Sequence, residues 1–297
     1  MASFGKTSFS HASYASFRPS YPQHLYAIVL GFHKGPRRLL VDLGTGHGLI
    51  CRSLASVFEK VVGTDPSEGM IKQAKTATTE DEYPNIDFVR ASAESLPFIK
   101  DESVDMAVAG QAAHWFDYPK LFKEMRRIIR PGGTLAFWGY TDHVFRDYPK
   151  ASRLLHETAY GMSKDLLGPY WQQPGRSIVQ NFLRDIKPPL GEWEVERGEY
   201  DPNLLGPQSK QGRFVMERRM SVVATMEYMR TWSSYHGWKE THPDKRARSA
   251  GGEGDVVDAL FEQIREAEPD WQGQENWQDK EVDIEWGTAL VLARKKQ

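Results

Sequence analysis

An apolar run at residues 38–43 leads directly into a glycine-rich stretch, Gly44-Thr45-Gly46-His47-Gly48, and a helical pattern begins immediately after it. This order of strand, glycine turn and helix is typical of the edge of an open α/β sheet at which ligands bind, because glycines let the backbone approach a ligand closely. The spacing is G-x-G-x-G, which differs from the G-x-G-x-x-G of dinucleotide-binding loops. The stretch therefore predicts a ligand-binding loop after the first strand of a parallel sheet.

Strand-like and helix-like patterns alternate along residues 39–140. This alternation predicts a doubly wound, mostly parallel, Rossmann-like α/β sheet with right-handed crossovers. Two later strand patterns bring the expected sheet to seven strands, and we expect a hairpin at Gly287 within the last of them. The expected strands are 38–43, 60–65, 86–90, 104–109, 134–140, 192–200 and 282–294, and the first helices are 49–59, 67–76 and 118–129.

The composition excludes several classes of protein. The chain has 38 basic and 40 acidic residues, which is not the basic excess of a general nucleic-acid binder. Its single cysteine, Cys51, excludes an intrachain disulfide and a cysteine-built zinc site and is typical of a reducing compartment, so we expect a cytoplasmic protein. No apolar run approaches the roughly 18–20 residues of a membrane-spanning helix. We therefore expect no nucleic-acid, membrane or metal partner, and the sequence leaves the oligomeric state open.

An acidic residue, Asp65, stands at the end of the second predicted strand. A carboxylate at this position can accept hydrogen bonds from both ribose hydroxyls of a nucleoside, as the acidic residue of a Rossmann fold does. By itself it does not separate NAD from S-adenosyl-L-methionine. The glycine spacing, Asp42 two residues before Gly44, and the lack of a second nucleotide-binding pattern together favour S-adenosyl-L-methionine.

Residues 39–140, with this loop and Asp65, resemble the class I S-adenosylmethionine-dependent methyltransferases. Later motifs are similar to those of the fungal trans-aconitate methyltransferases, and the likeness extends over most of the chain. These motifs are Phe17-Arg18-Pro19-Ser20-Tyr21-Pro22, Ala113-His114-Trp115-Phe116-Asp117, Gly168-Pro169-Tyr170-Trp171 with Gln173-Pro174-Gly175-Arg176-Ser177, and Arg230-Thr231-Trp232-Ser233 with Tyr235-His236.

The resemblance implies a cofactor site along the carboxyl ends of the first four strands. Gly44, Thr45 and Gly46 would pass beneath the methionine part of the cofactor, and Asp42 would orient this loop or meet the cofactor's amine through water. The other implied contacts are Asp65 at the ribose, Pro66, Met70, Ser92, Ala93 and Glu94 around the adenine, Gln111 at the methionine amine, and Tyr14 and Arg18 over the methionine carboxylate.

The resemblance also implies one domain, residues 1–297, whose second half binds the acceptor. The expected parts are an N-terminal lid and helix (1–38), a cofactor-binding core (39–140), an acceptor-binding cap of helices and short strands with a long helix at 221–239 (141–281), and a terminal strand and tail (282–297). His114 is the catalytic candidate because it follows the fourth strand. It is also a candidate for contact with the substrate, together with Trp115, Tyr170, Trp171, Arg176, Arg230, Trp232 and Tyr235.

The acceptor implied by the resemblance is a small anionic molecule, a di- or tricarboxylic acid such as trans-aconitate. A carboxylate is already ionised at neutral pH and needs no base, and the sequence offers arginines but no evident lysine or carboxylate base in a motif position. Two alternatives remain open. One is an O-, N- or S-methyltransferase of fungal secondary metabolism that acts on a phenol, amine or thiol. The other is an inactive cofactor-binding protein that works by interaction.

Overall fold

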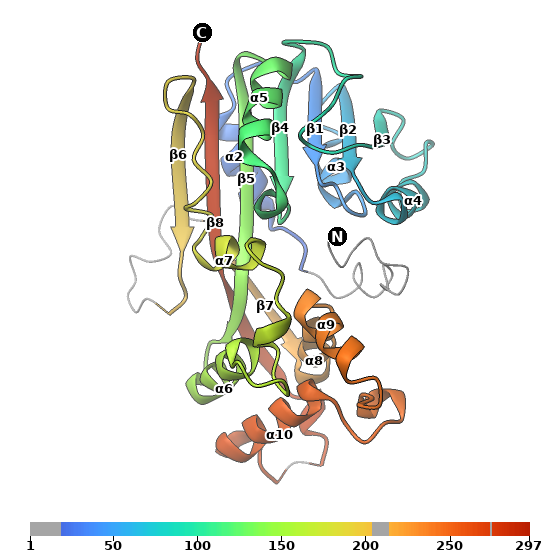
Figure 1. The fold of residues 1–297 in the computed structure, drawn as a ribbon, viewed down its shortest axis with the longest axis vertical. Coiled ribbons are helices and arrows are strands. Elements are labelled where there is room, and N and C mark those ends of the chain that lie inside the picture. Colours follow the sequence, from blue (N-terminus) through green and yellow to red (C-terminus); the bar gives the residue numbers. More distant parts are fainter. Residues whose placement is uncertain (1–18, 204–213, 274) are drawn as a thin grey trace.

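A computed structural model describes residues 19–203, 214–273 and 275–297 (Figure 1). Its centre is an eight-stranded sheet in the order β3-β2-β1-β4-β5-β8-β6, with β7 paired to β8. Strands β1 to β5 run parallel, whereas β8 runs antiparallel to its neighbours. The strands are β1 (Leu39–Leu43), β2 (Lys60–Asp65), β3 (Ile86–Arg90), β4 (Val104–Gly110), β5 (Ile129–Phe145), β6 (Trp193–Tyr200), β7 (Met216–Ser221) and β8 (Glu281–Lys295).

Helices cover the sheet and extend beyond it. The predicted α/β fold class is confirmed, although β7 adds an eighth strand to the seven expected. Within the described residues, no helix is both long and apolar enough to cross a membrane. The α-helices are α2 (Gln23–Phe32), α3 (Leu49–Leu54), α4 (Glu68–Thr76), α5 (Tyr118–Ile128), α6 (Pro149–Tyr160), α7 (Gly175–Gln180), α8 (Val222–Arg230), α9 (Ser233–Thr241) and α10 (Val256–Ala267). The short 3₁₀ helices are η2 (Ala113–Trp115), η3 (Gly168–Tyr170), η5 (Arg248–Ala250), η6 (Pro269–Trp271) and η7 (Trp277–Asp279).

The two longest strands, β5 and β8, carry the sheet into the cap. In Figure 1 they continue past the carboxyl ends of β1 and β4 to the region where β7, α6, α8 and α10 gather. β6 pairs with the carboxyl-terminal half of β8, and β7 pairs with its amino-terminal half. The core and the cap therefore share one continuous sheet, and the cap is not connected by a flexible linker.

A β-bulge interrupts the pairing of β5 with β8. Tyr140 pairs with Thr288 and His143 with Trp286, so Thr141 and Asp142 lie opposite Gly287 alone. A Cβ atom on Gly287 would lie 2.5 Å from the Thr141 hydroxyl and 3.1 Å from the Phe182 ring, so a larger residue would force these side chains to move. The expected hairpin at Gly287 is wrong, because this glycine accommodates the bulge within an unbroken strand.

The long helix expected at 221–239 is also wrong, since two helices occupy this segment. α8 ends at Arg230, and Trp232 has an extended backbone, with φ −70° and ψ 144°, before α9 begins. The Thr231 hydroxyl donates a hydrogen bond to the Tyr228 carbonyl at 2.6 Å, an alternative to continued helical bonding. The break sets Trp232 between the two helices, where its side chain is buried.

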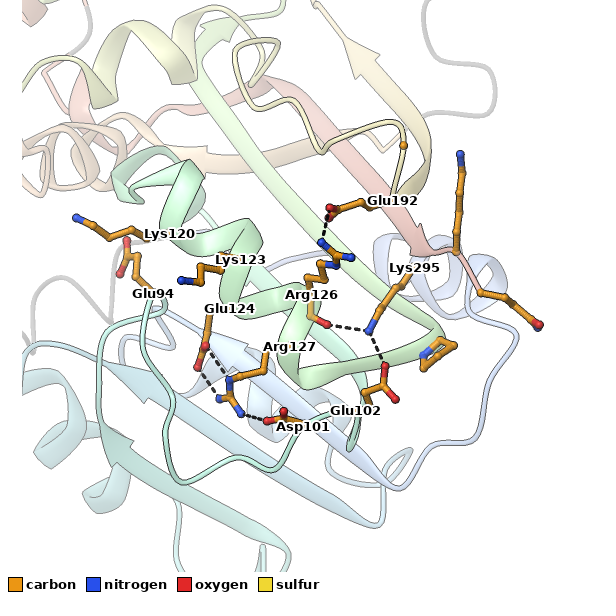
Figure 2. A pocket seen from close by; sticks show the side chains of 14 residues that line it. Glu94, Asp101, Glu102, Lys120, Lys123, Glu124, Arg126, Arg127, Glu192 and Lys295 are labelled. Carbon is orange, nitrogen blue, oxygen red and sulfur yellow. Dashed lines mark hydrogen bonds and ion pairs between the residues drawn. The ribbon is translucent and has the colours of Figure 1, made fainter.

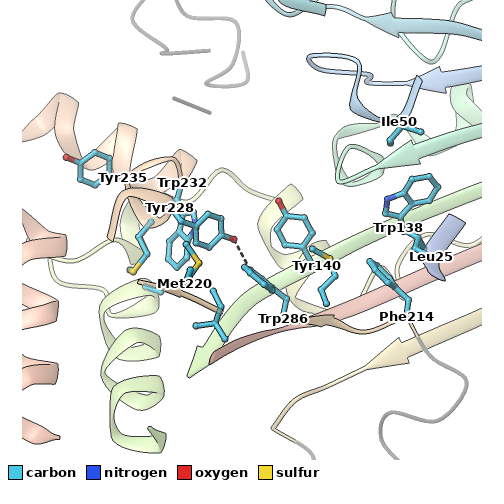
Figure 3. Packing of buried hydrophobic residues seen from close by; sticks show 14 of the residues in the cluster. Leu25, Ile50, Trp138, Tyr140, Phe214, Met220, Tyr228, Trp232, Tyr235 and Trp286 are labelled. Carbon is cyan, nitrogen blue, oxygen red and sulfur yellow. Dashed lines mark hydrogen bonds between the residues drawn. The ribbon is translucent and has the colours of Figure 1, made fainter. Parts of the chain in front are cut away.

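Aromatic side chains join the sheet to the cap (Figure 3). Trp286 of β8 donates its Nε1 hydrogen to the Tyr228 hydroxyl of α8 at 3.0 Å, and the two rings lie 5.8 Å apart. Tyr140 packs on the same tryptophan from β5. These rings belong to a buried cluster that extends from α2 to α10, so the apolar core continues beneath the cap.

Candidate active site

The glycine loop adopts the conformation that its sequence favours. Gly44 and Gly46 have φ angles of +69° and +55°, in the left-handed region that favours glycine. A Cβ atom on Gly46 would meet no heavy atom within 4 Å among the described residues, so the loop is open at this point. Gly44 instead lies against Ala112, beside Gln111 and η2. The loop is therefore open at Gly46 and adjoins the carboxyl end of β4 through Gly44.

Asp65 joins this loop to the next turn. Its carboxylate accepts hydrogen bonds from the Gly46 amide at 3.0 Å and from the Ser67 amide at 2.8 Å. Each oxygen of a carboxylate can accept more than one hydrogen bond, so these contacts are compatible with binding to ribose hydroxyls. The structure places Asp65 at the end of β2 beside Gly46, and its contact with a ribose stays a prediction.

Asp42 lies fully buried beneath the same loop. Its Oδ2 accepts hydrogen bonds from the Thr45 hydroxyl at 2.6 Å and from the Cys51 thiol at 3.5 Å, whereas Oδ1 has no partner among the described residues. Burial raises the pKa of Asp42 to about 7. The contact with Thr45 corresponds to the loop-orienting role that the resemblance implies.

The residues expected around the adenine lie beyond the ends of β2 and β3. Met70 and Ala93 are buried, and Pro66 and Ser92 are exposed. Glu94 accepts hydrogen bonds from the Ser92 hydroxyl and from the Asp117 amide, and thereby fastens this loop to the start of α5. Tyr14 and Arg18 lie outside the described residues.

Gln111 has a structural task that the sequence did not predict. Its side chain bonds the backbone of Tyr140 twice, donating from Nε2 to the carbonyl at 2.9 Å and accepting at Oε1 from the amide at 2.8 Å. Gln111 also has a positive φ of 53°, which is uncommon for a residue other than glycine. It fastens β4 to β5 where both strands reach the ligand edge of the sheet.

A small cavity of about 50 Å³ lies between this edge and the cap. It is smaller than the roughly 300–1,000 Å³ of common small-molecule sites, so an acceptor-bound state needs a wider cavity. The lining brings together Gln111, His114, Trp115, Trp171, Arg176 and Trp232, all of which the sequence predicted as site residues. It adds Tyr140, Thr141, Asp142, Gln172, Val179, Tyr228 and Ser233, which the sequence analysis did not single out.

Arg176 is the cationic side chain of this cavity. Its guanidinium lies 3.9 Å from the centre of the Trp171 ring, and its Nη2 donates to the Asp142 carboxylate and to the Tyr160 hydroxyl. Tyr160 also donates to Asp142. The Nε atom of Arg176 is buried without a partner among the described residues. The bulge in β5 brings Asp142 to this site, and its position just after a predicted strand end is the signal that could have identified it.

Three predicted substrate residues lie outside the cavity lining. Arg230 donates to both oxygens of Asp255, at 2.8 and 3.0 Å, and Tyr235 donates to the same carboxylate at 2.7 Å. Asp255 in turn caps the first turn of α10. Tyr170 packs on α9 and donates its hydroxyl hydrogen to the Lys164 carbonyl at 2.9 Å. These contacts hold α8, α9 and α10 together, which gives Arg230 and Tyr235 a structural task.

A larger surface hollow, of about 980 Å³, lies around α5 and the carboxyl-terminal tail (Figure 2). Charged side chains line it, and many of them neutralise one another, as in the pairs of Arg127 with Glu124 and of Lys295 with Glu102. Apart from Glu94 it contains no predicted site residue. Within the described part of the chain, no cluster of three or more metal-ligating side chains occurs in this hollow or elsewhere.

Comparisons with known proteins agree with this geometry. Residues 41–137 match the family described as "Methyltransferase domain". A Saccharomyces cerevisiae protein whose assigned name is "Probable S-adenosylmethionine-dependent methyltransferase CRG1" is 32% identical, over 99% of both chains. The chain belongs to the S-adenosylmethionine-dependent methyltransferases. A solved structure of a proposed type II methyltransferase from Anaeromyxobacter dehalogenans covers 94% of this chain and is itself covered to 98%, with 25% identity and a TM-score of 0.69.

The glycine loop of this methyltransferase fits its cofactor, S-adenosyl-L-methionine. The backbone is open at Gly46, the Asp65 carboxylate stands beside it, and the buried Asp42 has an oxygen without a partner in the described chain. Carboxylates near the loop suit a ligand that carries an ammonium and a sulfonium. The protein is therefore an enzyme that uses S-adenosyl-L-methionine, and the loop at the carboxyl ends of β1 and β2 has the geometry and charge that suit this cofactor.

Proposed function

We propose that the enzyme methylates a carboxylate oxygen of a small di- or tricarboxylic acid, for which trans-aconitate is the first candidate. One observation carries the proposal: Arg176 presents a guanidinium to the cavity, with a buried Nε that has no partner among the described residues. A buried donor of this kind is unfavourable unless a ligand satisfies it. Arginine is suited to hold a carboxylate because its planar donors match the carboxylate oxygens.

The chemistry fits an acceptor that is already ionised. When bound, the cofactor supplies a methyl group activated by its sulfonium. A carboxylate oxygen forms the bond to the methyl carbon while the methyl–sulfur bond breaks, and that electron pair stays on sulfur, so no proton moves. The enzyme must hold this oxygen about 3 Å from the methyl carbon and in line with the sulfur. Arg176 anchors a second carboxylate, while Trp171 and Trp232 exclude water.

The proposal predicts which arginine binds the acceptor. Arg176→Lys keeps the positive charge beside Asp142 but loses the planar donors, so kcat/KM for the acid should fall about 10- to 100-fold, as expected for a lost charge-assisted hydrogen bond. Arg184→Lys, at an exposed pair with Glu199, is the matched control and should change kcat/KM less than twofold. Mass spectrometry of products from a panel of small acids identifies the methyl ester.

A second function is favoured by one observation. Asp142 places a carboxylate in the cavity, and such a group can act as the base that a phenol, amine or thiol acceptor needs. The enzyme would then belong to fungal secondary metabolism. If the product panel yields only methylated phenols, amines or thiols and no ester, this reading replaces carboxyl methylation.

A further inference from the structure

The acceptor cavity contains a buried pair of opposite charges. The side chain of Arg176 is 10% exposed and that of Asp142 is 15% exposed. The residues that line the cavity include one arginine, Arg176, and one carboxylate, Asp142; the other lining residues are neutral or histidine. Arg230, the other arginine predicted to bind substrate, is neutralised outside the cavity by Asp255, Asp258 and Glu227. The arginine and the carboxylate of the cavity wall therefore offset each other.

Asp142 limits which chemical group an acceptor can carry beside the carboxylate that Arg176 binds. An anion held by Arg176 lies close to the Asp142 carboxylate, and a second anionic group there is repelled in a poorly solvated site. A hydrogen-bond donor is attracted instead. Both contacts that Asp142 receives, from Arg176 and from Tyr160, go to Oδ2, and Oδ1 accepts no hydrogen bond from the described residues. Oδ1 is thus available to a donor on the acceptor.

We propose that Asp142 determines acceptor specificity, selecting acids that carry a hydroxyl or a similar donor next to the carboxylate held by Arg176. A third ionised carboxylate at that position is disfavoured. The inference rests on the proposed function, methylation of a carboxylate in a small di- or tricarboxylic acid. Within that class it places hydroxy acids ahead of trans-aconitate, which has a third carboxylate and no hydroxyl. The bulge opposite Gly287 supports it, because the backbone itself brings Thr141 and Asp142 to the cavity.

Three acids that share a four-carbon dicarboxylate skeleton test this role. They differ at carbon 2, which carries hydrogen in succinate, a hydroxyl in malate and a third carboxylate in ethane-1,1,2-tricarboxylate. For the wild-type enzyme at pH 7.5, kcat/KM for ester formation should be highest for malate, and at least tenfold above that for the tricarboxylate. A wild-type enzyme that prefers the tricarboxylate would overturn the inference without any variant.

Asp142→Asn removes the charge and keeps the size of the side chain. The malate-to-tricarboxylate ratio of kcat/KM should fall at least tenfold in this variant, whereas the exposed control Asp147→Asn should leave it unchanged. The ratio is measured within one preparation, so a smaller folded fraction does not alter it. If acids are methylated but the ratio stays constant in D142N, the specificity role is wrong and the proposed function stands. If no acid of any kind is methylated, both are wrong.

Discussion

The glycine loop and the cap of this enzyme hold their carboxylates in different ways. At the glycine loop, Asp42 and Asp65 accept hydrogen bonds from hydroxyl, thiol and backbone donors. In the cap, Asp142 at the cavity and Asp255 outside it are each paired with an arginine. The hydrogen bonds to the carboxylates of the glycine loop thus come from neutral groups, whereas each of these two cap carboxylates is balanced by an arginine.

This difference separates the effects of mutations. A change at the glycine loop should alter ligand binding or pH dependence, because Asp42 is fully buried and accepts hydrogen bonds from neutral donors only. A change to one partner of a cap pair should leave the other charge buried and alone, and so should reduce stability.

The largest effect is expected for Arg230→Ala. Removal of this guanidinium leaves Asp255 and Asp258 buried without their cation, which should lower the free energy of unfolding by about 3–5 kcal/mol. Chemical denaturation measures this change. Arg184→Ala breaks an exposed pair and should lower stability by no more than about 1 kcal/mol. An equally small loss for Arg230→Ala would mean that the cap does not depend on this network.

The part of the molecule that was predicted from sequence is the part whose signals are local. The loop from Asp42 to Gly46 is contiguous, and Asp65 ends the following strand, so pattern and spacing were sufficient to place them together. The alternation of strands and helices likewise predicted a mostly parallel sheet, which β1 to β5 form. The eighth strand, β7, was missed because its segment, Met-Glu-Arg-Arg-Met-Ser, has no alternating apolar pattern. Its three charged residues in succession are exposed to solvent, and the strand pairs only with β8 among the described strands.

The cap could not be predicted in the same way because its contacts join distant segments. Arg176 and Arg230 both lie among aromatic residues in the sequence, and only their partners, Asp142 and Asp255, distinguish the cavity arginine from the structural one. Asp142 in turn reaches the cavity through a bulge opposite Gly287, far along the chain. No local pattern encodes such a pairing, so the sequence left both arginines as equal candidates.

An intermediate effect is expected on the pH dependence of stability. Burial raises the pKa of Asp42 to about 7, above its value in the unfolded chain, so the folded protein binds a proton that the unfolded chain releases. Stability should therefore fall as pH rises from about 4 to about 7, by up to about 1.4 kcal/mol per pH unit from this group. Asp255 differs, because Arg230 lowers its pKa despite burial, so its contribution is lost only in more acidic solution.

Denaturation curves of the wild type and of Asp42→Asn between pH 4 and pH 8 isolate this contribution. The variant carries a neutral side chain at every pH, so the wild type should lose stability relative to it as pH rises. Asp87→Asn, at an exposed pair with Lys60, serves as the control and should show no such trend. If the stability of the wild type and of Asp42→Asn changes with pH in the same way, the pKa of Asp42 is the same in the folded and unfolded protein, and the expected effect of burial is absent.

The smallest effect is expected from a pair of glycine substitutions that separate folding from binding. Gly46 and Gly132 have similar φ angles, +55° and +74°, and a Cβ on either would meet no heavy atom within 4 Å among the described residues. Alanine at each position should therefore lower stability by a similar amount, about 1 kcal/mol, through backbone strain alone.

The two variants should differ in cofactor binding. Only Gly46 lies in the glycine loop, whereas Gly132 lies near the amino end of β5. Calorimetric titration with S-adenosylhomocysteine should show weaker binding for Gly46→Ala and unchanged binding for Gly132→Ala, since the new methyl group enters the open face of the loop in the first variant alone. Equal affinities in the two variants would place the cofactor away from Gly46.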